Sequence, residues 1–393
     1  MNPTLHGILV FLETWWVELT SGIVIVAVVP LVAGYVVLVE RKLMADMQAR
    51  LGPMRVGPHG LLQPIADAVK LLIKEDIIPA ESDKLIFWLA PVISMVAALT
   101  SMGAIAFGPA FQVARDINIG ILFVLGVSSL GFLGIILGGW ASNSHYSIIG
   151  ALRSTAQLVS YETAGGLAII SALLLSGTLK ISGIVQAQYE QHVWFVFLAP
   201  VAAFIYLVAS IAETNRAPFD LPEAESELVA GYMTEYSGFR WALYFLAEYA
   251  NIFVVSSVAV TVFWGGWLRP FPSVAWLEMP LNYGVPVLLF IGSGGACLQL
   301  VKKLVDPIQR KVLLAAIAAL VLVGVVFAVP VVNNALIGLF WFLFKVSTII
   351  YLMIWFRGTF PRYRYDQLMN IGWKVAIPVG MVAVIINAVL GMA

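Results

Sequence analysis

Acidic residues gather in one short segment of this chain, residues 213–240. The segment also holds Arg216 and Arg240, and its carboxylates are Glu213, Asp220, Glu223, Glu225, Glu227 and Glu235. Carboxylates this close together, at a site partly shielded from water, cannot all ionise at neutral pH, so some should have raised pKa values and share protons. The pattern therefore predicts proton-handling chemistry. A solvated acidic loop between two transmembrane helices is the alternative that the composition leaves open.

Three further ionisable residues fall within segments that are otherwise apolar. They are Glu162, Glu248 and Lys345, and Glu213 ends another such segment. An intramembrane charge is costly unless it is paired, hydrated or neutralised, so these residues indicate functional sites. Because Glu162 and Glu248 have matched depth beside the acidic segment, they predict a path along which a proton, or its electrostatic effect, moves. A set of interhelical ion pairs, such as Lys345 with Glu248, is the alternative.

The composition requires a membrane around these residues. Of the 393 residues, 61% are hydrophobic and 11% are charged, and a soluble core cannot hide so much apolar surface. A spanning helix needs about 20 mostly apolar residues. The sequence therefore predicts an all-α, polytopic transmembrane protein, a single membrane domain over 1–393, with about ten spans: 19–38, 85–107, 117–139, 156–176, 193–212, 241–264, 283–300, 312–331, 335–356 and 372–391.

Basic residues give these spans an orientation. Lysine and arginine concentrate in cytoplasmic loops, and an amino terminus on the outside places most of them there. Only Arg115, Lys180 and Arg269 then face outward. The amino terminus has no basic n-region or small-residue cleavage site, so the first apolar helix is expected to stay in the mature protein.

The first cytoplasmic loop, 40–84, is long and patterned. After the turn-rich stretch 51–58, apolar residues recur at helical spacing from Leu62 to Ile73, with polar residues between them. This pattern predicts an amphipathic helix at the membrane surface. A plain surface anchor fits the pattern equally well, but the rigid Gly-Pro frame around Arg55 favours a fixed wall.

Several kinds of cofactor site are disfavoured. The single cysteine, Cys297, cannot form an intrachain disulfide or supply the ligands of an iron–sulfur cluster. The four histidines are scattered without metal-ligand spacing, so no metal site is expected. No Gly-rich nucleotide loop follows a strand pattern, and nothing suggests nucleic-acid binding.

Long motifs together resemble one family. Val-Glu-Arg-Lys at 39–42 and Arg-Leu-Gly-Pro-Met-Arg-Val-Gly-Pro at 50–58 precede the amphipathic stretch 61–75. The other matching stretches are 212–228 and 360–369, the latter followed by Gly-Trp-Lys at 372–374. They are similar to the H subunit of bacterial respiratory complex I, the counterpart of mitochondrial NADH dehydrogenase subunit 1. The match covers nearly the whole chain.

The resemblance implies a membrane subunit of the proton-pumping NADH:quinone oxidoreductase, in the cell inner membrane. It implies that ubiquinone or menaquinone enters through a tunnel lined or flanked by Arg41, Arg55, Arg216 and Phe219. It implies a coupling path through Glu162, Glu213 and Glu248, with the acidic loop formed by Asp220, Glu223, Glu225, Glu227 and Glu235, and a lysine-bearing helix with Lys345. The FMN and the Fe–S clusters would belong to partner subunits. The implied partners are the peripheral-arm subunits at the quinone site and the antiporter-like membrane subunits.

One segment departs from the family pattern. After Gly265-Gly266-Trp267 an insertion, 268–334, carries two extra apolar segments, and we expect these to lie peripherally against lipid or another subunit. Because two spans restore the original side, the downstream topology survives. Two other functions remain open: the equivalent subunit of a membrane-bound hydrogenase or formate hydrogenlyase, and a free-standing proton-coupled transporter.

Overall fold

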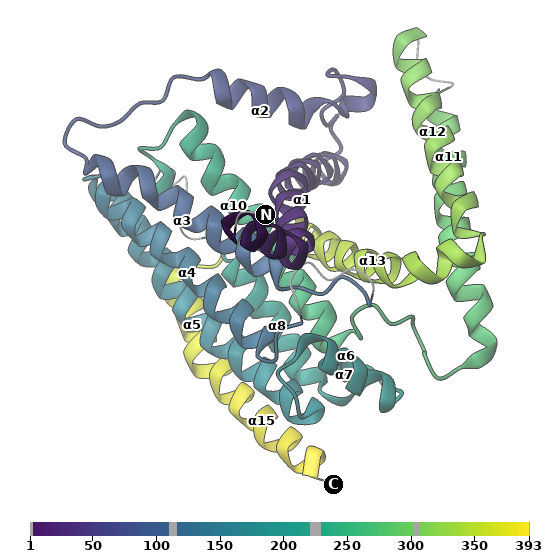
Figure 1. Ribbon diagram of the computed structural model, residues 1–393. Helices are drawn as coiled ribbons and strands as arrows, with labels where there is room; N and C mark the ends of the chain where they lie inside the picture. The colour runs from purple at the N-terminus through teal and green to yellow at the C-terminus, as the bar shows by residue number, and fades with distance from the viewer. Residues whose placement is uncertain (1–2, 110–115, 221–228, 302–306, 393) are drawn as a thin grey trace.

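The structure is a computed structural model that describes residues 3–109, 116–220, 229–301 and 307–392 (Figure 1). Within these ranges the chain is helical and contains no β-strand, as the sequence predicted. The elements, with 3₁₀ and π turns labelled η, are α1 (Pro3–Met47), η1 (Pro58–Gly60), α2 (Gln63–Ile73), α3 (Lys84–Gly103), α4 (Gly120–Ala141), α5 (His145–Ser176), α6 (Ile181–Glu190), α7 (Phe195–Leu198), α8 (Pro200–Glu213), η2 (Gly231–Met233), α10 (Gly238–Phe263), η3 (Ala275–Leu277), η4 (Pro280–Gly284), α11 (Val285–Val301), α12 (Pro307–Phe327), α13 (Pro330–Thr359), α14 (Tyr365–Ile371), η5 (Gly372–Ala376) and α15 (Ile377–Met392).

Nine helices in the described ranges are long and apolar enough to cross a membrane, which confirms a polytopic helical membrane protein. The expected span 193–212 is the one that differs. Its backbone breaks at Ala199, and Pro200 begins α8 at the first helical position, where its missing N–H costs nothing. The 14 residues of α8 reach about 21 Å at 1.5 Å per residue, less than the bilayer core of about 30 Å. This segment therefore does not cross as one continuous helix.

Helix α10 runs through the core of the molecule. Most of its residues are buried, and it packs against α1, α3, α8 and α13. Glycines let the surrounding helices approach closely. A Cβ on Gly134 of α4 would lie 2.1 Å from the Ser94 hydroxyl of α3, and a Cβ on Gly150 of α5 would lie 2.7 Å from the Gly231 Cα of η2. Small residues at helix interfaces are how membrane proteins achieve tight packing without a hydrophobic driving force between helices.

The amphipathic helix in the first loop is confirmed as α2. None of its residues is buried, and Leu72 and Ile73 are 63% and 80% exposed. The turn before it requires glycine at Gly60, where φ is +77° and a Cβ would lie 2.2 Å from the Pro53 carbonyl oxygen. This fixed turn sets the direction in which α2 leaves α1.

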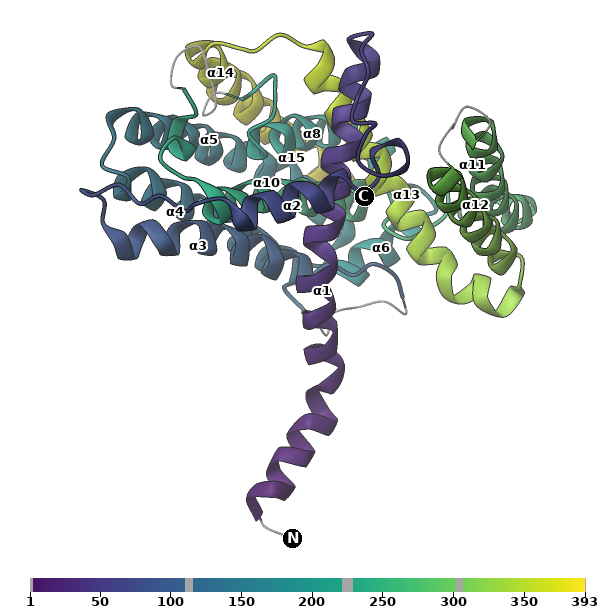
Figure 2. The ribbon, with the colours of Figure 1, turned by 90° about the horizontal axis from the view of Figure 1, so that it is seen from above.

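The two apolar segments of the insertion form a hairpin, α11 and α12. It stands to one side of the main helix bundle, beyond α13, in both views (Figures 1 and 2). Val301, Leu313 and Ile317 are buried between its two helices. It meets α13 through a separate aromatic cluster.

Candidate functional site

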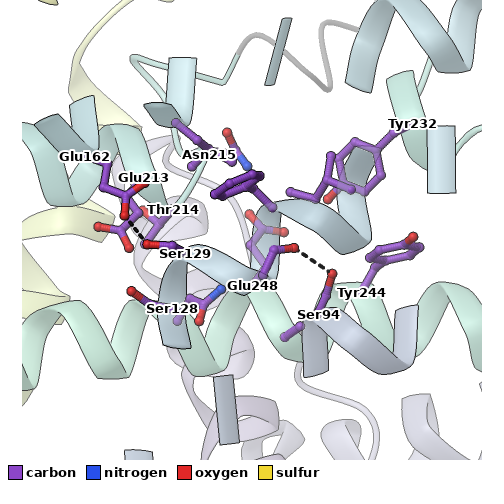
Figure 3. Close-up of a pocket in the computed structure, with 16 residues that line it drawn as sticks. Ser94, Ser128, Ser129, Glu162, Glu213, Thr214, Asn215, Tyr232, Tyr244 and Glu248 are labelled. Carbon is purple, nitrogen blue, oxygen red and sulfur yellow. Dashed lines mark hydrogen bonds between the residues drawn. The ribbon is translucent and has the colours of Figure 1, made fainter. Parts of the chain in front are cut away.

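A polar cavity lies among α3, α4, α5, α8 and α10 (Figure 3). It is lined by the carboxylates Glu162, Glu213 and Glu248, which come from three different helices, and by several hydroxyl and amide side chains. Its volume of about 50 Å³ can hold a few water molecules, since one water needs about 10–15 Å³. Three of the intramembrane carboxylates that the sequence singled out therefore share one small polar space.

Within the cavity the three acids are not equivalent. Figure 3 shows Glu162 and Glu213 close to each other, with Glu248 farther along. The Ser129 hydroxyl of α4 donates a hydrogen bond to the Glu162 carboxylate. Two carboxylates side by side in a site with few waters repel each other when both are charged, so a proton or an ordered water between them lowers the free energy.

A buried cluster of charges adjoins the cavity at Glu248. The Arg216 Nε lies 2.8 Å from the Glu248 Oε1, and the Arg216 Nη1 lies 3.5 Å from the Glu40 Oε1. Arg357 of α13 also donates to the Glu40 carboxylate. The Tyr249 hydroxyl donates to the Glu40 Oε2 at 2.8 Å, and the Arg216 guanidinium lies 4.3 Å from the centroid of the Tyr249 ring. Two arginines and two glutamates balance here, which is what a buried ionic site requires.

Glu248 thus belongs to both groups of residues. Its carboxylate lines the polar cavity and also pairs with Arg216. A change of charge at Arg216 or Glu40 therefore acts on the cavity carboxylates through one intervening side chain. Buried charges are weakly screened, so such an effect is strong over a few ångströms.

The segment after α8 is held firmly in place. The Gln157 Nε2 of α5 donates to the Ala212 and Phe219 carbonyl oxygens, each at 2.8 Å. The Phe219 ring stacks on the Tyr363 ring at 5.8 Å between centroids, and the Arg362 Nη2 donates to the Asp220 Oδ2 at 3.1 Å. The motif at 360–364 therefore acts as a support for the start of the acidic loop.

Of the remaining acidic residues of the segment, only Glu235 is among those that the structure describes. Glu223, Glu225 and Glu227 lie outside the described residues, and Glu235 lies between η2 and α10 without lining the cavity. Beside it, burial raises the pKa of Tyr236 to about 12. The hydroxyl therefore stays protonated at neutral pH and donates to the Phe87 carbonyl oxygen at 3.2 Å, which ties the returning chain to α3.

Arg41 lies near the end of α1, and Arg55 lies in the first loop. The Arg41 Nη1 is 2.7 Å from the Asp67 Oδ2, so this ion pair joins α1 to α2, and 45% of the Arg41 side chain is exposed. Arg55 is exposed in the turn before η1. The structure does not place these two arginines in the buried cluster of Arg216.

Lys345 lies elsewhere. Its ammonium donates to the carbonyl oxygens of Trp264, Gly266 and Leu268, each at 2.7 Å, and lies 4.6 Å from the centroid of the Trp194 ring. These carbonyls end α10 and form the turn that follows it. The ion pair of Lys345 with Glu248, given as an example of the alternative, does not form: Glu248 pairs with Arg216, and Lys345 caps the carboxyl end of α10.

A large apolar groove lies between α1, α10 and α13. Its volume is about 720 Å³, and it is lined mostly by aliphatic side chains such as Val28, Val32 and Leu343. Tyr249 lines this groove and also belongs to the buried charge cluster. An elongated apolar space therefore meets a charged site at one aromatic ring.

Known proteins are similar to this sequence over nearly its full length. The NADH dehydrogenase family profile matches residues 20–388. H subunit 2 of the NADH-quinone oxidoreductase of Solibacter usitatus is 67% identical over 374 residues, which cover 94% of this chain and 95% of the relative. H subunit 1 of the same enzyme in Koribacter versatilis is 52% identical over 369 residues, covering 90% and 86%. The H subunit of Rickettsia felis is 42% identical over 370 residues, covering 93% and 92%.

The chain belongs to the NADH dehydrogenase family. Within that family it groups with the H subunits of NADH-quinone oxidoreductase, as its motifs suggested. It is therefore a multi-pass membrane subunit of an oxidoreductase complex. Among the described residues of this NADH dehydrogenase family member, no group of three or more His, Cys, Asp or Glu side chains could hold a metal ion.

The site contains residues that sequence reasoning missed. Glu40, Tyr249 and Arg357 complete the cluster around Arg216. Glu40 stands in the Val-Glu-Arg-Lys motif directly after the apolar stretch 19–38. Its position at the end of a span was the available signal, and the neighbouring Arg41 and Lys42 made it look like part of a solvated polar terminus.

Proposed function

We propose that this chain admits quinone from the membrane and couples the reduction of the quinone to proton translocation through buried carboxylates. The observation that carries this proposal is the double role of two adjacent residues of α10. Tyr249 belongs to the apolar groove and to the charge cluster, and Glu248 belongs to the charge cluster and to the polar cavity.

The groove suits the apolar part of a quinone. An isoprenoid tail is insoluble in water and needs a continuous apolar surface, which the groove between α1, α10 and α13 offers. The polar headgroup needs a polar site at the end of such a channel. We assign Arg41, Arg55, Arg216 and Phe219 to the lining or flank of the headgroup passage.

The chemistry demands protons where electrons arrive. A quinone takes up two electrons and two protons to become a quinol, so negative charge develops on its oxygens until protons reach them. The electrons come from partner subunits that carry the FMN and the Fe–S clusters. Positive side chains such as Arg216 stabilise the developing anion. The pairing of Arg216 with Glu40 and Glu248 then rearranges, and this passes the change of charge on to the cavity carboxylates.

The cavity carboxylates respond to that change. Glu248, Glu213 and Glu162 form a short file, and the proton occupancy of each depends on the charge of its neighbours. We propose that the acidic loop with Asp220, Glu223, Glu225, Glu227 and Glu235 delivers or senses protons on the same path. Lys345 supports the far end of α10, and any part it has in coupling acts through that helix.

This function implies a membrane, an orientation and partner subunits for the chain. We propose a cell inner membrane with the amino terminus outside, and contacts with peripheral-arm subunits near the loops and with antiporter-like subunits beside the carboxylates. Mild-detergent isolation tests this part, because a complex subunit purifies with redox partners, whereas a free-standing transporter purifies alone. A quinone-site inhibitor separates the quinone-reducing complex from a hydrogenase relative.

A substitution at Tyr249 tests the site. Tyr249→Phe keeps the ring that lines the groove and lies under Arg216, but it removes the hydrogen bond to Glu40. A hydrogen bond to a charged group contributes about 1.5–3 kcal/mol, so we expect quinone reduction by the complex to fall about tenfold or more.

The readouts for this variant are NADH:quinone activity and NADH oxidation with an artificial electron acceptor. The second activity reports the peripheral redox centres and should stay at the wild-type rate. Full quinone activity in Tyr249→Phe would contradict the proposed link between the groove and the cluster.

A further inference from the structure

The α11–α12 hairpin is the largest part of the chain to which the proposed function gives no role. None of the residues that the structure describes in it lines the polar cavity or the apolar groove. Nevertheless, it is attached to the molecule at defined places. These attachments determine which parts of the molecule the hairpin lies beside.

The first attachment is to α13. Phe327 of α12 contacts Phe340 of α13 with 5.6 Å between ring centroids, and Phe290 of α11 stacks on Phe327 at 5.7 Å. The buried Asn333 amide donates to the Asn282 and Phe327 carbonyl oxygens at 2.9 and 2.8 Å. Because the amide nitrogen satisfies carbonyls on both sides of the hairpin, the hairpin is held in one orientation on α13.

The second attachment is to the first loop. Helix α12 packs against η1, the turn that joins α1 to α2. The hairpin therefore reaches from α13 to the loop that follows α1. Helices α1 and α13 are two walls of the apolar groove.

The rotation of α13 shows which side of the groove the hairpin borders. Leu339, Leu343 and Ser347 face the groove, and Asn333 and Phe340 face the hairpin. With about 100° between successive residues of an α-helix, the two stripes lie roughly 70° apart. The core-facing stripe of α13 lies on the other side of the groove stripe. The hairpin thus stands at the outer rim of the groove, on the side away from the core.

The exposed surfaces of the two helices near this rim are apolar. On α12, Leu322 and Val325 are 65% and 52% exposed, and on α1, Val28 and Val32, which line the groove, are 44% and 37% exposed. Between Val312 and Phe327, α12 has no charged residue. Such surfaces contact hydrocarbon chains and offer no partner to a charged headgroup.

We propose that the α11–α12 hairpin is a lateral screen at the membrane entrance of the groove, which admits the single isoprenoid chain of a quinone and hinders two-chain phospholipids. This inference rests on the proposed function and adds how the groove selects its occupant. A single chain is slim and ends at the polar cluster beside Tyr249. A phospholipid must bring a second chain and a charged headgroup past the same rim.

The test uses the intact complex in proteoliposomes and quinones of two tail lengths. Replacing residues 275–332 with a short linker removes the screen. Phospholipid then competes for the groove, so the KM for a long-tailed quinone should rise about threefold or more, while kcat and the KM for a short-tailed quinone stay unchanged. NADH oxidation with an artificial acceptor reports assembly.

A point variant keeps the test decisive if the deletion does not assemble. Asn333→Ala loosens the hairpin on α13 and should shift the ratio of the two KM values in the same direction. Asn387→Ala is the matched control, because Asn387 is equally buried, but its amide binds Ser171 on the opposite side of the molecule. It should leave the ratio unchanged.

The outcomes separate the two proposals. A wild-type complex that reduces no quinone would overturn the proposed function. A complex that reduces both quinones, with an unchanged KM ratio in the deletion and in Asn333→Ala, would overturn the screen alone. Loss of a co-purifying membrane chain with an unchanged ratio would assign the hairpin to protein docking.

Discussion

At the scale of single residues, the structure separates a buried, balanced cluster of charges from charges that hold the backbone in place. The side chains of Glu40 and Glu248 are nearly buried, and Arg216 pairs with both of them. Removing one member would leave a buried charge without its partner, which costs about 3–5 kcal/mol. The cluster is therefore stable only as a balanced set, and a balanced set responds when the charge beside it changes.

Lys345 illustrates the other kind of charge. Its three hydrogen bonds go to backbone carbonyls at the end of α10, where a cation stabilises the negative end of the helix dipole. We expect Lys345→Met to lower the thermal stability and the yield of the assembled complex. The complex that does assemble should pump the normal number of protons per quinone reduced.

The ratio of protons pumped to quinone reduced is the deciding measurement for Lys345. A lower ratio in a fully assembled Lys345→Met complex would mean that the lysine takes part in coupling directly. Comparing both quantities in the same proteoliposome preparation removes differences in yield.

At the scale of elements, helix contacts without room for a side chain position the site. Gly150 of α5 meets the backbone of η2, which lies at the end of the acidic segment. We expect Gly150→Ala to force α5 and η2 apart and to destabilise the complex by about 1–3 kcal/mol. Gly166→Ala, in the same helix but with no atom within 4 Å of the new Cβ, should be tolerated. The temperature of half-inactivation measures both variants, and equal values would contradict the close contact.

The elements themselves followed from the sequence far better than their contacts. Long apolar runs predicted the spans, because a helix that crosses lipid must be apolar along its length. The break at Ala199 was not foreseen, since Pro200 lies inside an apolar run that is long enough to cross. The composition of such a run predicts its length but not a break in the backbone within it.

The pairing of side chains could not be predicted. Arg357 binds Glu40 across 317 residues of sequence, and their contact depends on the depth and rotation of α1 and α13. The partners of Lys345 are backbone carbonyls, which every residue type carries. By contrast, Glu162, Glu213 and Glu248 were recognisable, because a carboxylate within an apolar run is rare enough to stand out.

At the scale of the whole molecule, the chain links an apolar groove to a polar cavity through two adjacent residues of its central helix. The apolar groove, the charge cluster and the cavity lie in that order, and each shares one side chain with the next. A protein that handles quinone needs this order, because a hydrocarbon tail, a charged intermediate and a proton each require a different environment.

The most direct test is the proton pumping of the complex with Glu213→Gln, reconstituted in proteoliposomes. Glutamine keeps the shape of the side chain but cannot take up or release the proton, so pumping driven by quinone reduction should fall strongly. NADH oxidation with an artificial acceptor should remain at the wild-type rate, and Glu81→Gln, an exposed exchange of the same type, should pump normally. Undiminished pumping by the Glu213→Gln complex would contradict the proposed coupling through the cavity carboxylates.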